Sequence, residues 1–393
     1  MAKHVADTSD ERSYDIVLFG ASGFTGGLTA HYLAEHAPQG CRWALAGRNL
    51  VKLEEVRASL GEGFADLPLL QADSTDPASL AAIAADARVV ISTVGPYLLY
   101  GEPLVRACAE AGTDYVDLTG EPEFVDRMYL EHHDTAVRSG ARLVHACGFD
   151  SIPHDLGAYF TVKQLDTSSP VRLRGVVRSN GTFSGGTFHS AMTAMSRARQ
   201  MSATFAQRRK KEGRPEGRSV RAISGKPGRD RELGFWLLPL PTIDPQIVVR
   251  SAAALPAYGK DFGYSHFAGL KTLRYTVGSM VVVPGLAVAA QVPPVRKALM
   301  SRIQPGDGPS EARRAKTWFT VDFVGSAGAA KVHTRVSGGD PGYTETAKML
   351  AESALCLAFD DNPETAGQVT TATAMGDALL ERLRAAGIRF EVC

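Results

Sequence analysis

Apolar runs alternate with amphipathic stretches along the first 150 residues of the chain. Six short runs have the character of buried strands, and a stretch with helical spacing follows each of the first five. The predicted strands cover residues 16–19, 42–46, 67–72, 88–93, 115–118 and 142–146, and the predicted helices cover residues 28–36, 50–60, 76–85, 103–111 and 123–138. Strands and helices that alternate in this way form a parallel sheet with helices on both faces. The pattern therefore predicts an α/β fold with a doubly wound parallel sheet over residues 13–150.

The pattern changes after residue 150. Polar and apolar residues alternate over residues 172–178, as they do in a strand with one exposed face. A chain of 393 residues is too long for one ordinary core, so we expect a second α+β domain over residues 151–340 for substrate or subunit contacts. A C-terminal segment, residues 341–393, follows it. The other predicted elements are a helix at 190–206, paired strands at 318–324 and 329–337, helices at 344–359 and 369–386, and a final strand at 388–392.

Residues 275–295 form an apolar segment without a charged side chain. Its 21 residues approach the length of a membrane span, but Pro284, Pro293 and Pro294 argue against one straight spanning helix. One interpretation is a buried segment at an interdomain or homodimer interface. The other is an element that contacts a membrane surface or lipid, aided by the basic residues that follow it.

The composition is that of an ordinary globular protein, with 44% hydrophobic and 22% charged residues. A net charge of +1 gives no general attraction to nucleic acid, so we expect no nucleic-acid partner. The five cysteines form no CxxC pair and no cluster with histidines at metal-binding spacing, which predicts reduced thiols and no metal site. Residues 1–12 are polar and lack the apolar core of a signal peptide, so we expect a disordered N-terminus and a cytoplasmic protein.

A glycine-rich turn joins the first predicted strand to the first predicted helix. Its spacing is GxxGxxG, which differs from the GxGxxG of the simplest Rossmann pattern. In a dinucleotide fold one glycine permits the turn, one lets the backbone approach the pyrophosphate, and one lets helix and strand pack closely. The phosphates would bind the free N–H groups of the helix N-terminus. The loop residues predicted to bind the cofactor are Gly20, Ser22, Gly23, Phe24, Thr25 and Gly26.

The end of the second predicted strand indicates which dinucleotide binds. An NAD enzyme places an acidic residue there, which binds the ribose 2′-hydroxyl. This chain has Arg48 and Asn49 instead, and a guanidinium suits a 2′-phosphate through paired hydrogen bonds. We therefore expect NADP(H) as the cofactor; the alternative is that Arg48 is a solvated residue at a strand end. Asp73, at the end of the third strand, is expected beside the adenine amino group or as a helix cap.

The loop after the fourth predicted strand would border the nicotinamide ribose, because ligands bind outside the carboxyl ends of the strands. There Gly95 permits close approach of the cofactor and Pro96 stiffens the turn. Tyr97 provides a phenol that donates a proton, orients a carbonyl group, or packs beneath the cofactor.

The run from residue 145 to residue 155, after the sixth predicted strand, contains two histidines, one thiol and two acids. We expect it at the same crevice, with Asp150 and His154 as candidate catalytic residues. The alternative is a helix cap at Asp150 and packing of the thiol of Cys147.

These motifs resemble those of the saccharopine dehydrogenase-like NADP oxidoreductases, and most closely those of the mycobacterial trans-acting enoyl reductases. The matching motifs are GASGFTGG (20–27), LAGRN (45–49), STVGPYLLYGEPLVRAC (92–108), YVDLTGE (115–121), HACGFDSIPHDLG (145–157) and AKMLAESALCLAFD (347–360). The resemblance implies C-terminal helices that return to the Rossmann domain. It also implies reduction of a C=C bond of a carrier-bound polyketide or fatty-acyl intermediate in cell-envelope lipid biosynthesis.

Three functions stay open at this point. The first is an NADPH-dependent enoyl reductase in which Tyr97, His154 or water supplies a proton to the substrate. The second is a saccharopine-type amino-acid C–N dehydrogenase, which would need basic side chains to hold carboxylates, and the sequence shows no clear set of them. The third is an NADP-binding or lipid-surface protein without turnover, because a fold can be kept when its chemistry is lost.

A basic segment adds an expectation about partners. Residues 197–231 contain twelve lysines and arginines against three acids, and their second half has the glycines and prolines of an exposed loop. Such a segment could steer the docking of an acidic carrier protein that delivers the acyl substrate. The alternative is an ordinary solvated loop.

Overall fold

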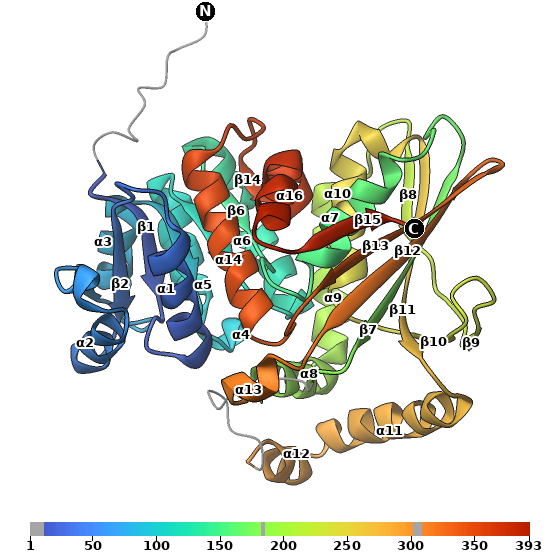
Figure 1. Cartoon of the computed structure of the whole chain (residues 1–393), viewed down its shortest axis with the longest axis horizontal. Coiled ribbons are helices and arrows are strands. Elements are labelled where there is room, and N and C mark those ends of the chain that lie inside the picture. The colour runs from blue at the N-terminus through green and yellow to red at the C-terminus, as the bar shows by residue number, and fades with distance from the viewer. Residues whose placement is uncertain (1–11, 182–184, 302–308) are drawn as a thin grey trace, which may run out of the picture.

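The computed structural model describes residues 12–181, 185–301 and 309–393, so residues 1–11, most of the stretch predicted to be disordered, lie outside the described residues. Two sheets organise the molecule, and they lie side by side along its longest axis (Figure 1).

The first sheet has seven parallel strands in the order β14-β6-β5-β4-β1-β2-β3. Its strands are β1 (Tyr14–Phe19), β2 (Trp43–Gly47), β3 (Leu69–Gln71), β4 (Ala87–Ser92), β5 (Asp114–Asp117), β6 (Arg142–Val144) and β14 (Gly367–Val369). The central strand β1 shows why the sheet is buried on both faces, since Ile16 and Leu18 pack into one core and Val17 and Phe19 into another. The predicted doubly wound sheet is confirmed.

Helices cover both faces of this sheet. They are α1 (Phe24–His36), α2 (Leu50–Ser59), α3 (Pro77–Asp86), α4 (Tyr97–Tyr100), α5 (Glu102–Ala111) and α6 (Pro122–Ser139), with a 3₁₀ turn at Glu62–Phe64. Helices α3, α5 and α6 pack on the face of Val17, whereas α1, α2 and the C-terminal α14 (Thr344–Phe359) pack on the face of Ile16. Asp76 caps α3 and Pro77 is its first residue, a combination that favours a helix start.

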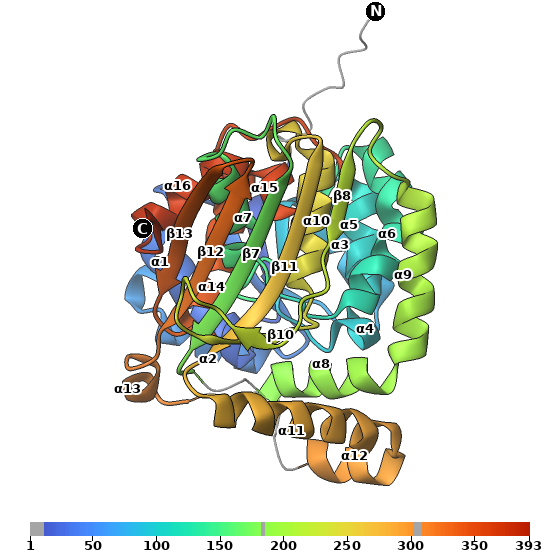
Figure 2. The same cartoon turned by 90° about the vertical axis from the view of Figure 1, so that its right-hand side faces the viewer.

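The second sheet mixes parallel and antiparallel pairs in the order β15-β13-β12-β7-β11-β10-β9, and β8 also pairs with β11. Its strands are β7 (Val171–Ser179), β8 (Ser219–Ala222), β9 (Gly228–Arg229), β10 (Trp236–Pro239), β11 (Asp261–Leu270), β12 (Phe319–Ala327), β13 (Ala330–Gly338) and β15 (Arg389–Val392). Figure 2 shows these long strands crossing the face of the molecule, with α7 (Ile152–Val162) and α10 (Asp244–Ala254) behind them. The predicted α+β architecture of this half is therefore confirmed.

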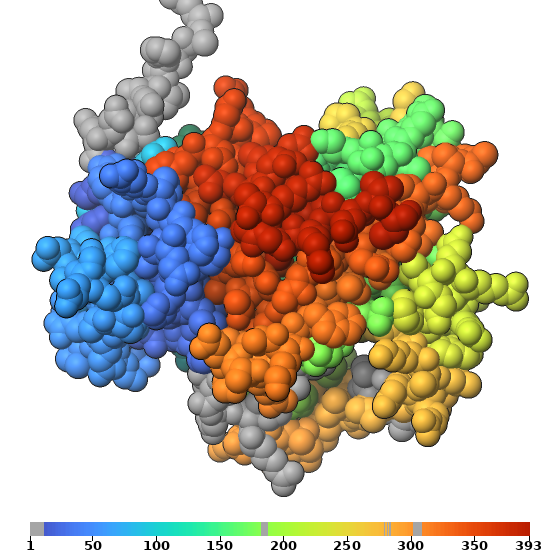
Figure 3. Space-filling view, in the orientation of Figure 1, coloured from blue at the N-terminus to red at the C-terminus, as the bar shows by residue number. Residues whose placement is uncertain are grey.

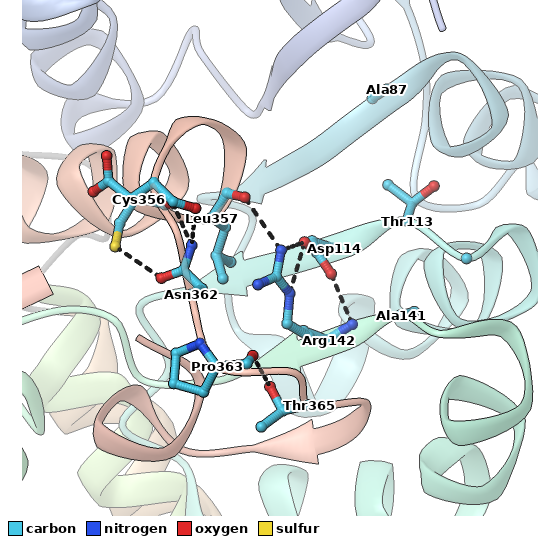
Figure 4. Close-up of polar contacts among 12 residues, drawn as sticks. Ala87, Thr113, Asp114, Ala141, Arg142, Cys356, Leu357, Asn362, Pro363 and Thr365 are labelled. Carbon is cyan, nitrogen blue, oxygen red and sulfur yellow. Dashed lines mark hydrogen bonds and ion pairs between the residues drawn. The ribbon is translucent and has the colours of Figure 1, made fainter. Parts of the chain in front are cut away.

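The C-terminal segment contributes to both sheets. Its helix α14 packs against α1, β14 joins the first sheet beside β6, and β15 joins the second sheet beside β13. In Figure 3 this segment (red) occupies the surface between the two halves of the molecule. Figure 4 shows one attachment: Arg142 pairs with Asp114 of β5 and donates to the carbonyl oxygen of Leu357 in α14 at 3.1 Å.

Three sequence-based expectations need correction. The helix predicted at 369–386 is two helices, α15 (Thr371–Ala374) and α16 (Gly376–Ala385), and its first residue ends strand β14. Thr370 caps α15, and the extended φ of Met375 with the positive φ of Gly376 (+45°) separates the two helices. The helix predicted at 190–206 is two helices, α8 (Gly185–Ser196) and α9 (Ala198–Glu212), which meet at Arg197. The loop predicted after α9 contains the two short strands β8 and β9.

The apolar segment 275–295 is helical but not buried. It forms most of α11 (Leu273–Gln291), which contains Pro284, and the start of α12 (Pro293–Met300); the remaining short elements are α13 (Glu311–Arg314) and a 3₁₀ turn at Pro256–Tyr258. Helices α11 and α12 lie along the lower edge of the molecule beneath α8 (Figure 2). A buried interdomain position is therefore wrong for this segment. Within the described ranges, no helix is both long and apolar enough to cross a membrane.

Candidate functional site

The glycine loop after β1 has the geometry that a dinucleotide requires. Gly20 adopts φ +91°, which favours glycine, and an added Cβ there would lie 2.6 Å from Thr93 Oγ1. At Gly26 an added Cβ would lie 2.2 Å from the carbonyl oxygen of Gly20, so this glycine lets α1 pack closely on β1. At Gly23 an added Cβ would meet, within 4 Å, only the Gly20 carbonyl oxygen at 3.4 Å. As expected, Gly20 permits the turn, Gly26 permits close packing, and Gly23 leaves an open space, which we call the cradle.

The cradle at Gly23 lies directly at the N-terminus of α1. Gly23 is the N-cap, with φ −80° and ψ 164°, and no side chain of the described chain caps the helix. The first N–H groups of α1 are therefore directed at the space beside exposed Ser22 and Gly23, where an anionic pyrophosphate is favoured. The other two loop residues hold the helix in place: the Phe24 ring packs edge-to-face on Tyr343 at 4.9 Å, and the Thr25 carbonyl accepts from Thr29 at 2.8 Å.

The 2′-phosphate candidates lie at the end of β2. Arg48 is exposed, and its guanidinium has no hydrogen bond or ion pair within the described part of the chain. Asn49 is the N-cap of α2, where its side chain accepts from the Lys52 amide at 3.1 Å. Asp73 accepts from the amide and hydroxyl of Thr75, both at 2.8 Å, and these bonds together with nearby Arg48 lower its pKa. Asp73 does not cap α3, which is the role of Asp76.

The loop after β4 packs into the sheet rather than projecting from it. Gly95 is exposed, and its peptide bond to Pro96 is cis. Tyr97 is buried, and its hydroxyl donates to the Ser92 carbonyl oxygen at 2.9 Å. Burial and the charge of Asp117 raise its pKa well above the ordinary value. This geometry favours the packing role of Tyr97 over proton transfer.

Glu121 connects the loops at this edge. Its carboxylate accepts from the amides of Tyr97 and Leu98, at 3.2 and 2.8 Å, and from the hydroxyl of Ser190 in α8 at 2.9 Å. A buried carboxylate with three donors holds the N-terminus of α4, the loop after β5 and α8 together.

Asp150 lies at the same edge, in the turn before α7. Its carboxylate approaches Gly120 so closely that a Cβ there would lie 2.6 Å from Asp150 Oδ2. Burial, and then the charge of Asp244, raise the pKa of Asp150 to about 6, although His154 opposes the shift. A carboxyl that titrates near neutral pH suits a general acid. Asp150, which the alternative interpretation placed as a helix cap, does not cap α7. The N-cap is Ser151, whose side chain makes no capping hydrogen bond.

His154 belongs to a buried cluster that sequence reasoning did not find. Its Nδ1 lies 2.8 Å from Oδ1 of Asp244, the first residue of α10, and its ring packs edge-to-face on His266 of β11 at 4.9 Å. His266 Nε2 lies 3.6 Å from Asp244 Oδ2, and its Nδ1 is 3.0 Å from the hydroxyl of Tyr264. Burial lowers the pKa of His266 to about 4, so it is neutral at pH 7.

Asp244 is the charged member of this cluster. Burial opposes its ionisation, but His154 and His266 outweigh burial and lower its pKa. A carboxylate that faces Nδ1 holds that nitrogen protonated and leaves Nε2 for other chemistry. His154 Nδ1 and Nε2 and Asp244 Oδ1 are buried, and none of them has a hydrogen-bond partner among the described residues, so the contact between Nδ1 and Oδ1 is an ion pair. The ligand atoms of His154, Asp244 and His266 lie within 4.8 Å of one another, so these three side chains could also hold a metal ion.

The other strand-end histidine forms a separate pair. His145 Nδ1 lies 2.7 Å from Asp117 Oδ2, and both side chains are buried. Asp117 Oδ1 also accepts from the amides of Thr119 and Ala146, at 3.0 and 2.9 Å. These bonds fix the loops after β5 and β6, and Cys147 is buried beside them.

Comparison with known proteins agrees with this geometry. Residues 16–144 match the family described as the saccharopine dehydrogenase NADP binding domain. The trans-acting enoyl reductase of Mycobacterium tuberculosis (strain H37Rv) is 38% identical over 415 residues, 96% of this chain and 97% of that protein. The protein of the same name from Mycobacterium leprae is 36% identical over 408 residues, again 96% and 97%. Apo saccharopine dehydrogenase (L-Glu forming) from Saccharomyces cerevisiae has the same fold, with a TM-score of 0.56, 13% identity, and coverage of 96% and 99%.

Proposed function

Because this chain belongs to the family of the trans-acting enoyl reductases, with a saccharopine dehydrogenase NADP binding domain, we propose that it reduces a C=C bond of an acyl intermediate with NADPH. The acyl chain would be a polyketide or fatty-acyl thioester on a separate carrier protein, in the biosynthesis of cell-envelope lipids. One observation carries the proposal: the same sheet edge brings together a dinucleotide cradle at Gly23 and a carboxyl at Asp150 whose pKa is about 6.

The residues at this edge of the sheet have different roles in cofactor binding and proton transfer. NADPH, when bound, supplies the hydride that the β-carbon accepts. Gly23 leaves space for the pyrophosphate and Arg48 binds the 2′-phosphate. Asp150, which keeps part of its protonated form near neutral pH, provides the proton for the α-carbon. Asp244 orients His154 beside it, and His154 is thus a second candidate for that proton.

The carrier protein would dock on α9. The structure divides the basic residues of this helix into two sets. Arg208 is buried against Asp126 at 2.8 Å, so it supports the fold. Arg209 and Lys210 are exposed and make no ion pair within the described chain, and α9 lies on the outer side of α6 (Figure 2). An acidic carrier is attracted by these free charges.

A substrate panel tests the reaction. We expect NADPH oxidation, followed at 340 nm, with an enoyl thioester on an acyl carrier protein, and a product two mass units heavier by mass spectrometry. Turnover of saccharopine but not of the enoyl thioester would assign the protein to the amino-acid C–N dehydrogenases. NADPH binding without turnover of either compound would indicate an NADPH-binding protein that has no enzymatic activity.

The Asp244→Asn variant tests the orienting role of that carboxylate. We expect kcat for the enoyl substrate to fall by about 10²-fold, because His154 loses the negative partner at 2.8 Å that fixes its tautomer. The KM for NADPH should stay unchanged, since Asp244 lies outside the glycine loop. An equal loss of NADPH binding would show a general structural role instead.

A further inference from the structure

Helices α11 and α12 expose an unusual concentration of apolar side chains. Eight of the seventeen exposed large hydrophobic side chains of the described chain lie in this segment: Leu273, Tyr275, Val277, Met280, Val282, Val288, Val292 and Val295. Val288 is 69% exposed and Tyr275 is 66% exposed. Exposed apolar side chains that gather in one segment of a soluble protein often mark a contact site.

The charged side chains of the segment itself all have one sign. Lys271 and Arg274 precede the apolar part of α11, and Arg296 and Lys297 lie in α12. The sequence contains no aspartate or glutamate from residue 262 to residue 306. The surface is therefore apolar with a basic rim, which is complementary to anionic lipid headgroups above an acyl layer.

The segment is attached to the body of the protein through α8. Gln291 in α11 donates to the carbonyl oxygen of Met195 in α8 at 2.6 Å, and His189 Nε2 lies 3.1 Å from the carbonyl oxygen of Met300. On its other side, α8 carries Ser190, which donates to Glu121 at the sheet edge. One helix thus separates the apolar surface from the loops of the candidate site, as the lower part of Figure 2 shows.

The charge pattern distinguishes two occupants of this surface. In a two-fold symmetric dimer through the same face, each copy would present basic side chains to the other, and the segment offers no acid to pair with them. An anionic membrane pairs with every one of them. Helix α11 has 19 residues, so it is about 28 Å long and can lie flat in the interface with Pro284 within it.

We propose that α11 and α12 form a membrane-contact surface that docks the protein on the face of a bilayer containing anionic lipid. The apolar side chains enter the boundary between headgroups and acyl chains, and the basic rim contacts the headgroups. Docking in this orientation places α8 and the loops behind it next to the bilayer.

Vesicle co-sedimentation of the full-length protein tests the proposal. We expect binding to phosphatidylglycerol–phosphatidylcholine vesicles and at least tenfold weaker binding to vesicles of phosphatidylcholine alone. The double variant Arg274→Gln, Lys297→Gln should weaken binding to the anionic vesicles by about 25-fold, because each basic side chain near such a surface contributes roughly fivefold. High salt should have a similar effect.

A matched pair of valines provides the control. Val282 in α11 and Val392 in β15 are both 58% exposed, so Val282→Glu and Val392→Glu change the surface equally. Val282→Glu should weaken vesicle binding about tenfold or more, whereas Val392→Glu should leave it unchanged. NADPH binding of each variant confirms its fold.

Two results would overturn the proposal. The first is absent or lipid-independent sedimentation of the wild-type protein. The second is a dimer in analytical ultracentrifugation that Val282→Glu dissociates and Val392→Glu does not, since a second copy would then cover the surface.

Discussion

Gly23→Asp should abolish NADPH binding while the fold stays intact. Gly23 has φ −80°, which an aspartate adopts without strain, and the nearest atom to an added Cβ is the Gly20 carbonyl oxygen at 3.4 Å. Aspartate is also a favourable N-cap and stabilises a helix N-terminus, so the melting temperature should stay equal or rise slightly. The same carboxylate would occupy the space of the pyrophosphate.

The magnitude follows from Coulomb repulsion. Two unit charges 4 Å apart at an effective dielectric constant of 20 repel by about 4 kcal/mol, which corresponds to roughly a thousandfold loss of affinity. Fluorescence titration with NADPH measures this loss, and thermal unfolding measures the stability. Retained NADPH binding in a folded Gly23→Asp variant would refute the assignment of this cradle to the pyrophosphate.

Gly26→Ala is the contrasting variant in the same loop. Its Cβ would lie 2.2 Å from the Gly20 carbonyl oxygen and 2.9 Å from Ala21 Cα, which are both backbone atoms. The loop must shift, at a cost of about 1–3 kcal/mol in the free energy of unfolding. Stability should therefore fall in Gly26→Ala and not in Gly23→Asp. Equal stability of the two variants would contradict this division of roles.

Further variants test the remaining charges of the site. Arg48→Ala should raise the KM for NADPH by about 10- to 100-fold and leave that for NADH unchanged, and equal effects on both would exclude the 2′-phosphate contact. Asp150→Asn should raise the free energy of unfolding at pH 7 by up to about 3 kcal/mol, because the pKa of Asp150 rises from 3.8 unfolded to about 6 folded; chemical denaturation should show this gain vanish as the pH falls from 6 to 4. The double reversal Arg209→Glu, Lys210→Glu should raise the KM for the carrier-bound substrate about tenfold and leave that for the coenzyme A thioester unchanged, whereas equal KM values would exclude docking on α9.

Local sequence patterns predicted strands β1 to β6 of the first sheet well, because each of these strands is specified by residues that are close together in the sequence. Each strand before residue 150 is an apolar run between glycines and polar turns, and the glycine spacing correctly placed the turn between β1 and α1. The second half was harder to predict. β14 has only three residues, Gly367–Val369, and it forms only because β6 offers an unpaired edge far away in the sequence.

The cluster of His154, Asp244 and His266 shows the same limit more sharply. His154 was a candidate because it follows a strand end, but its partner Asp244 lies 90 residues later in an Ile-Asp-Pro sequence typical of any helix start. Nothing in the spacing connects the two. The packing of α7 against α10 brings them together.

The positions of β14 and β15 bear on how the two halves of the enzyme can move. One continuous segment, from Gly367 to Val392, adds a strand to each sheet. This segment therefore connects the two halves of the enzyme. In a hinge motion between the two halves each strand would stay in its own sheet, and the intervening residues 370–388, which contain α15 and α16, would have to move. Helix α8 is held to the sheet edge by the contact of Ser190 with Glu121 and to α11 by the contact of Gln291 with Met195, so a movement of α8 would have to break or carry both contacts.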